Sequence, residues 1–264
     1  MFLSFVLALA CVVADDGDVQ AGDTADSGGS DGGDTDSADA GSDLDPVCTE
    51  PSEVGCIDEM ILDLSLHDDL VSDGDVSNDK DGDDWVSVVD ASAGGMYDAD
   101  KNPWIYLRFT DDGLERVDID DETALEEMTW HLSARRYILR LNSGTSGPSC
   151  VGGAEVKGDY ADVTTSDAEG ADYNLEHFYD EECKIIEDNS NLPGSLDVVL
   201  GGWWDYVSCV ATTAQAFVIQ LDDGRLLKFT VEQYYKGDGQ DECNNEGSTN
   251  KESGIFTFRW RFLE

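Results

Sequence analysis

Side chains that commonly hold metal ions or act as general bases are scarce in this sequence of 264 residues. Its histidines are His67, His131 and His177, and no two of them have the i, i+4 spacing of a metalloprotease helix. Ser146 lies in a Gly-Thr-Ser-Gly segment, which differs from the nucleophile elbow of hydrolases. No glycine loop that could hold a phosphate precedes a helix-like segment. These features favour a non-catalytic binding protein over an enzyme.

Carboxylates, by contrast, are so abundant that no single pair indicates glycosidase chemistry. The chain has 59 Asp+Glu against 15 Lys+Arg, a formal net charge of -44. This charge excludes nucleic acid as a partner, because phosphate binding needs clustered Lys and Arg, and it excludes charge-driven docking onto anionic lipid.

An Asp-rich stretch over residues 73–83 fails the spacing test for a calcium loop. With Gly82 at position 6 of an EF-hand loop, position 12 is Val88 where the motif requires Glu. We therefore expect a solvated acidic loop. The alternative is weak calcium association with Asp73, Asp75, Asp79, Asp81 and Asp83.

The amino-terminal part of the chain differs in composition from the rest. Residues 1–79 hold 21 acidic residues, and Lys80 is the first base. The apolar residues 1–11 predict a signal peptide with a lipobox, in which Cys11 is lipidated; an ordinary signal peptide is the alternative. Residues 12–47 predict a disordered acidic tether. We expect a folded domain over residues 48–264, exported to the bacterial outer membrane or cell surface and touching the membrane only through its lipid anchor.

Six cysteines remain after Cys11, and an even number behind an export signal indicates up to three disulfides in an oxidising compartment. Fifteen pairings are open in principle. Short loops favour Cys48–Cys56, Cys150–Cys183 and Cys209–Cys243. The absence of a Cys-x-x-Cys motif, and of a Cys beside a His, argues against zinc.

The body of the chain has the patterns of β-strands. Asp-Asp-Gly triplets at 111–113 and 222–224 predict two hairpins. Aromatic residues alternate with mostly polar ones over residues 254–263, which places them on one face of a strand. A short helix is expected only at 122–129, and the Gly- and Asp-rich residues 143–175 and 236–253 are expected to be long connections. The fold class is therefore mainly β, with antiparallel sheets, long loops and at most short helices. The remaining strands are predicted at 85–89, 104–109, 114–119, 134–142, 216–221 and 225–234.

Residues 130–147 carry a recognisable motif: Trp130 opens it, a basic and aromatic group follows, and Asn142 ends it before a Gly/Ser turn. A strand, Asp-Gly turn and Lys-aromatic strand ending in Tyr-Tyr follow at 216–235, and an aromatic strand at 254–262. Together these resemble the HmuY-like family of bacterial surface lipoproteins over residues 85–264. Physically, the matched residues are expected to be structural: Trp130 and the aromatics of the last strand as core anchors, and Gly144 and Gly147 as turn residues. Arg135 and Arg136 are expected to pair with acids or to cover apolar surface with their stems.

The resemblance implies haem binding, with iron held between two His or Met side chains on loops that follow the central motif, inside an apolar pocket. Here residues 143–200 hold one His, His177, and no Met. His177 is therefore the predicted iron ligand, and His67 and His131 are weaker candidates. A second ligand would have to be a tyrosine, with Tyr160, Tyr173 and Tyr179 available. The partners implied are haem or a similar flat apolar ligand and an outer-membrane receptor.

Two other functions remain open. The scaffold could serve as an adhesion or protein-interaction module that has lost its iron ligands, as the shortage of His and Met indicates. It could also be a secreted glycan-active enzyme that stacks sugars on Trp203 and Trp204, although these side chains are better placed to pack a strand.

Overall fold

The computed structural model describes residues 47–190, 192 and 194–264. The predicted signal peptide, the lipidation site Cys11 and the tether up to residue 46 lie outside these residues. Within the described part of the chain, no helix is long and apolar enough to cross a membrane.

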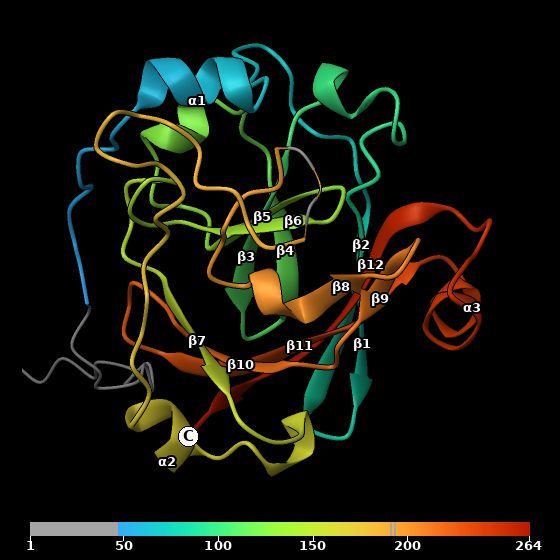
Figure 1. Ribbon diagram of the computed structural model, residues 1–264. Coiled ribbons are helices and arrows are strands. Elements are labelled where there is room, and N and C mark those ends of the chain that lie inside the picture. The colour runs from blue at the N-terminus through green and yellow to red at the C-terminus, as the bar shows by residue number, and fades with distance from the viewer. Residues whose placement is uncertain (1–46, 191, 193) are drawn as a thin grey trace, which may run out of the picture. The chain divides into compact units, whose positions relative to one another are not determined.

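The largest element is a six-stranded antiparallel sheet (Figure 1). Its strands lie in the order β1, β2, β12, β11, β10 and β7, so the carboxyl-terminal strand lies at its centre. The predicted strands at 85–89, 216–221, 225–234 and 254–263 are all present in it. The bounds are β1 Val76–Asp81, β2 Asp84–Asp90, β7 Gly152–Val156, β10 Ala216–Gln220, β11 Leu226–Tyr235 and β12 Ser253–Leu263.

A four-stranded antiparallel sheet and a two-stranded hairpin complete the β structure, and the helices are short. The mainly antiparallel β fold is thus confirmed. The smaller sheet has the order β4 (Gly113–Val117), β3 (Ile105–Thr110), β5 (Leu132–Arg135), β6 (Ile138–Leu141), and the hairpin is β8 (Trp204–Tyr206) with β9 (Val210–Thr212). The helices are α1 (Ile57–Asp63), α2 (Thr165–Glu169) and α3 (Gly239–Glu246), with 3-10 turns η1 (Ala99–Lys101), η2 (Thr123–Leu125), η3 (Tyr160–Asp162) and η4 (Gly201–Trp203).

The main core lies between the two larger sheets. On β12 the alternation predicted from sequence holds, because Phe256, Phe258 and Trp260 are fully buried while the residues between them are half-buried. The Trp260 ring meets Phe109 of β3 edge to face, with 4.9 Å between ring centroids. Such large rings bury most of the apolar area that holds the sheets together.

A second, smaller core covers the other face of β3. Ile105, Leu107 and Phe109 point into the main core, while Tyr106 packs with Trp104 and Trp130 beneath α1. Because successive side chains of a strand point to opposite faces, β3 is buried on both sides. Figure 1 shows α1 and α2 at opposite ends of the domain.

The predicted strand 134–142 is wrong, because the chain turns within it to form the β5–β6 hairpin. Arg135 pairs with Ile138, which leaves Arg136 and Tyr137 as the turn. Arg136 adopts a left-handed backbone (φ 55). Its guanidinium donates to the backbone oxygen (3.1 Å) and the hydroxyl (2.8 Å) of Ser253, so a long-range contact holds a turn that local sequence does not favour.

Three expected irregular segments contain regular structure. The two long connections contain β7, η3, α2 and α3. Conversely, the helix predicted at 122–129 is only the 3-10 turn η2. The expected acidic loop at 73–83 contains the whole of β1, which pairs with β2. Arg259 of β12 pairs with Asp81 at 2.9 Å and so offsets part of that charge. No cluster of metal-ligating side chains lies among the described residues.

Two of the three predicted disulfides are wrong. The bonds are Cys48–Cys150, Cys56–Cys183 and Cys209–Cys243, and only the last was expected. Pairing the cysteines so that each bond closes a short loop gave the wrong bonds, because the amino-terminal segment runs across the domain. There the Ser52 N–H donates to the Pro148 carbonyl at 2.7 Å. The first two bonds therefore close loops with sequence separations of 102 and 127 residues.

The motif at 130–147 is structural, as predicted. The buried Asn142 amide donates to the carbonyls of Glu127 (3.0 Å) and Trp130 (2.9 Å) and accepts the Ser149 N–H at 3.0 Å. A Cβ atom on Gly147 would overlap the Asn142 side chain and approach the Trp130 ring to 2.7 Å. These residues interlock at the point where β6 gives way to the Gly/Ser turn.

We expect Asn142→Ala to lower the free energy of unfolding by about 2–4 kcal/mol, because it leaves two buried backbone groups and one partly buried carbonyl unpaired. Urea unfolding monitored by tryptophan fluorescence measures this loss. Asn245→Ala is the matched control, since Asn245 is exposed and bonds only within α3; its effect should stay within about 0.5 kcal/mol. Equal effects of the two variants would contradict the structural role of Asn142.

Candidate functional site

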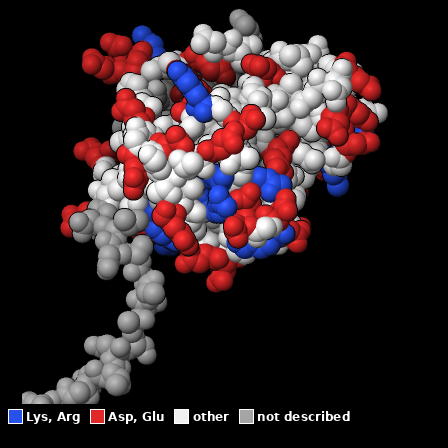
Figure 2. Space-filling view, turned by 90° about the horizontal axis from the view of Figure 1, so that it is seen from below, with Lys and Arg blue, Asp and Glu red and all other residues white. Residues whose placement is uncertain are grey.

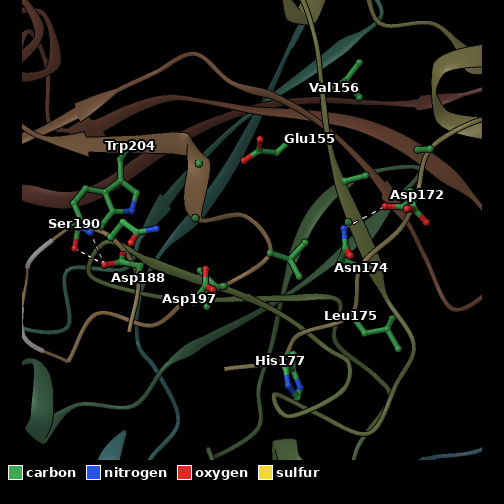
Figure 3. Close-up of a pocket in the computed structure, with 18 of the residues that line it drawn as sticks. Glu155, Val156, Asp172, Asn174, Leu175, His177, Asp188, Ser190, Asp197 and Trp204 are labelled. Carbon is green, nitrogen blue, oxygen red and sulfur yellow. Dashed lines mark hydrogen bonds between the residues drawn. The ribbon is translucent and has the colours of Figure 1, made fainter. Parts of the chain in front are cut away.

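A cleft of about 1070 Å³ opens beside β7. Its walls come from β7, from the segments 171–177 and 197–202 and from the start of the β8–β9 hairpin. In Figure 3, His177 and Leu175 lie at one end of the cleft, and Trp204 and Asp188 lie at the other. All of these segments follow the central motif, in the region where the sequence predicted the ligand site.

A buried carboxylate joins the walls of the cleft. One Glu176 oxygen accepts the backbone N–H of Leu141 on β6 at 2.9 Å, and the other accepts that of Val199 at 3.1 Å. Burial raises the pKa of Glu176 to about 7, although the two backbone hydrogen bonds and nearby Arg140 oppose this shift. Glu176 was not predicted from the sequence, where its only signal is its position as an acid between Leu175 and His177.

His177 directly follows Glu176 in the chain, so the hydrogen bonds of Glu176 help to position it. Its side chain is exposed, lines the cleft, and forms no hydrogen bond or ion pair with any described residue. An imidazole without a partner at the edge of a cavity is available to a metal ion or a ligand. The structure thus places the predicted iron ligand at a cleft of the described domain.

None of the three candidate tyrosines lines this cleft with His177. Tyr160 and Tyr173 pack with Ala216 and Val218 on the face of β10 opposite the main core. Tyr179 is buried near α1, where its hydroxyl donates to Asp63 at 3.2 Å. Burial raises the pKa of all three, that of Tyr173 to about 12, which disfavours the phenolate form that iron prefers.

The other two histidines also lie away from the cleft. His131 is buried, its Nδ1 accepts the Phe109 N–H at 3.1 Å, and its Nε2 faces Asp222 at 3.3 Å. Burial lowers the pKa of His131, and both of its ring nitrogens face partners within the domain, so neither is free to bind iron. His67 is half-buried, and its backbone N–H donates to Asp121 at 3.1 Å.

The tryptophan pair is divided between the core and the cleft. Trp203 is 1% exposed and meets Phe256 edge to face at 5.3 Å, so it packs the core as expected and offers no platform to a sugar. Trp204 is mostly buried but lines the cleft. Apolar contact in the cleft comes from Val156, Leu175, Val198, Val199, Trp204 and Tyr206.

Charge at the cleft is strongly negative. One base, Lys157, lines it together with six acids, namely Glu155, Asp167, Asp172, Asp188, Asp197 and Asp205. Elsewhere the bases lie among acids: Figure 2 shows the two interspersed on one face of the domain, and Arg259 pairs with Asp81 and Glu232.

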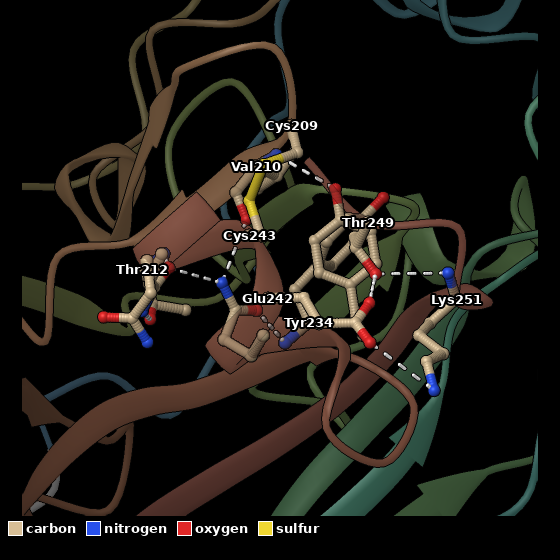
Figure 4. The surroundings of a disulfide bond; sticks show 12 residues. Cys209, Val210, Thr212, Tyr234, Glu242, Cys243, Thr249 and Lys251 are labelled. Atoms are coloured by element: carbon tan, nitrogen blue, oxygen red, sulfur yellow. Dashed lines mark hydrogen bonds and ion pairs between the residues drawn. A yellow bond between two sulfur atoms is a disulfide. The ribbon is translucent and has the colours of Figure 1, made fainter. Parts of the chain in front are cut away.

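The β8–β9 hairpin, which forms one cleft wall, is tied to α3 by the Cys209–Cys243 disulfide (Figure 4). Both cysteines are buried. The Val210 N–H donates to the Tyr235 hydroxyl at 2.9 Å, and the Gln240 amide donates to the Val210 carbonyl at 3.1 Å. The disulfide and these bonds hold a short hairpin that would be marginal alone.

Comparison with known proteins gives one family. The profile described as HmuY protein matches residues 100–260, more than half of the chain. A search of curated proteins finds no match.

Solved structures show a distant likeness. A HmuY-like haem-binding protein from Bacteroides vulgatus is 15% identical, with 67% of this chain and 91% of that chain covered and a TM-score of 0.43. A protein from Bacteroides fragilis described as a lipoprotein is 13% identical, with 74% of this chain and 97% of that chain covered and a TM-score of 0.41. The apo HmuY analog of Tannerella forsythia is 15% identical, with 74% of this chain and 98% of that chain covered and a TM-score of 0.40. These TM-scores lie below 0.5, so the family assignment rests on the sequence profile.

We expect the stability of the domain to fall as pH rises through the pKa of Glu176. The carboxyl has an ordinary value of 4.5 and a folded value of about 7, so unfolding releases a proton in this interval and higher pH favours the unfolded state. Relative to Glu176→Gln, the wild-type free energy of unfolding should drop by about 3 kcal/mol across the interval. Urea unfolding across that pH range measures it, and parallel pH curves for the two proteins would contradict it.

Removal of the Cys209–Cys243 bond should loosen the hairpin wall of the cleft. We expect Cys209→Ala/Cys243→Ala to lose about 3–4 kcal/mol of stability, the loop-closure estimate for this separation. Hydrogen exchange of the amides in β8 and β9 should accelerate more than that of β3, which the disulfide does not touch. Unchanged protection of the hairpin would show that its hydrogen bonds suffice without the disulfide.

Proposed function

Because the chain belongs to the HmuY family, we propose that it binds a haem-type ligand without catalysis, in the cleft at His177. The sequence resemblance stated above is thereby confirmed at the level of the family. The observation that carries the proposal is the exposed His177 imidazole, which has no partner among the described residues and faces the cleft that follows the family's central motif.

The donor set of the cleft fits haem with one protein ligand. Imidazole nitrogen is a common axial ligand of haem iron, and His177 supplies it. No Met, Cys or second His is among the described residues of the lining, and its one tyrosine, Tyr206, lies on β8 with Trp204. We therefore propose that His177 alone holds the iron and that Leu175, Val199 and Trp204 contact the flat ring and exclude water from its buried edge.

We further propose that the chain acts at the bacterial surface. The apolar residues 1–11 and Cys11 support export and lipid anchoring, and residues 12–47 would let the domain extend from the membrane. From there it would capture haem and pass it to an outer-membrane receptor. The exposed position of His177 supports transfer, because a ligand held at the rim of an open cleft can leave without unfolding of the domain.

Haemin added to the purified chain should produce a shifted Soret band that saturates at one haemin per chain. His177→Ala should remove the shift or weaken the affinity by at least the roughly 10- to 100-fold that loss of a supporting metal contact costs. His67→Gln is the control, since His67 does not line the cleft. An unchanged Soret shift in His177→Ala would overturn the assignment of the ligand.

The three tyrosines are tested in the same way. Because none lines the cleft, Tyr160→Phe, Tyr173→Phe and Tyr179→Phe should each leave the Soret band of the complex unchanged. A shifted band in one of them would identify a second iron ligand.

If the wild type binds no haemin but retains a partner from envelope extracts, the adhesion function replaces haem capture.

A further inference from the structure

The cleft carries a charge pattern that bears on which ligand it accepts. It is lined by the six acids named above against one base, a net charge of 1 − 6 = -5. None of these six carboxylates forms an ion pair with a described base, whereas the bases of β12 each pair with acids. Their charge is therefore uncompensated within the described domain.

Two of these acids line the cleft from different segments of the chain. Asp172 belongs to the segment before His177, and Asp205 belongs to β8. Both side chains are exposed, and neither carboxylate accepts a hydrogen bond from a described residue. Asn174 donates to the backbone oxygen of Asp172, not to its carboxylate. The charge of either acid can thus be removed with little effect on the fold.

Lys157 is the exception to this negative lining. It directly follows β7, its side chain is exposed, and it forms no hydrogen bond or ion pair with a described residue. A free ammonium group beside uncompensated carboxylates is the one position in the lining where a negative group of a ligand would be attracted rather than repelled.

We infer that the cleft selects against negative charge on its ligand: it takes a flat apolar ring whose acidic groups are neutralised, face water, or pair with Lys157. This inference rests on the proposed function and specifies its ligand class. Haemin carries two carboxylates, so one can meet Lys157 and the other must point to solvent. A tetrapyrrole whose carboxylates are esterified carries no negative charge on them, so the acids of the cleft do not repel it.

The test compares haemin with haemin dimethyl ester, each titrated into the purified chain in the same cosolvent. At low salt the ester should bind more tightly, by about tenfold, and at about 1 M salt the difference should shrink because exposed charges are screened. Asp172→Asn/Asp205→Asn should raise the affinity for haemin about threefold or more and leave that for the ester unchanged.

Lys157→Met should weaken haemin binding at low salt and leave ester binding unchanged. Lys184→Met is the matched control, because Lys184 is also exposed, forms no side-chain ion pair with a described residue and does not line the cleft. It should leave both affinities unchanged, which separates the local effect of Lys157 from the loss of one positive charge anywhere on the protein.

Each outcome has a distinct meaning. Equal affinities of the wild type for the two ligands, or tighter binding of haemin, would overturn the charge selection while leaving haem binding intact. Equal effects of Lys157→Met and Lys184→Met would overturn the role of Lys157. Binding of neither ligand by any of these proteins would overturn the proposed function, and the charge selection with it.

Discussion

The cleft depends on a single buried carboxylate. Glu176 accepts one backbone N–H from β6 and one from the segment before β8, so it joins a strand of the smaller sheet to the chain that leads into the hairpin wall. The side chain of its neighbour His177 has no partner among the described residues, so His177 is positioned through the backbone on either side, where Glu176 and Phe178 also bond to Ser143 and Thr145. A carboxylate buried in this way has few alternative arrangements, because any movement leaves charged and polar groups unpaired. The surface of the site is thus open while its base is fixed.

The fold was largely predictable where short-range patterns control the structure. The alternation of Phe256, Phe258 and Trp260 identified the central strand, and the Asp-Asp-Gly triplets marked both hairpins. Such signals arise from backbone geometry and burial, which act within a few residues of sequence. The turn at Arg136 gave no such signal, since the contacts that hold it come from Ser253 and Ala91.

The candidate site was predictable only in part. The family motif and the single histidine after it pointed to His177, which does line a cleft. The separation of Tyr160, Tyr173 and Tyr179 from that cleft follows from the path of the chain around α2 and α1, which spacing in the sequence does not encode. The disulfides show the same limit: Cys48 and Cys56 are near each other in sequence but bond to Cys150 and Cys183 across the domain.

The fold and the ligand chemistry therefore rest on different observations. Family membership and the antiparallel sheets describe the scaffold, whereas the proposed function depends on one imidazole in an acidic cleft. The central claim, that His177 alone holds the iron, is tested most directly by electron paramagnetic resonance of the ferric complex. We predict the high-spin signal of iron with a single protein ligand, lost in His177→Ala. A low-spin signal from two protein ligands, or a signal indifferent to His177, would contradict it.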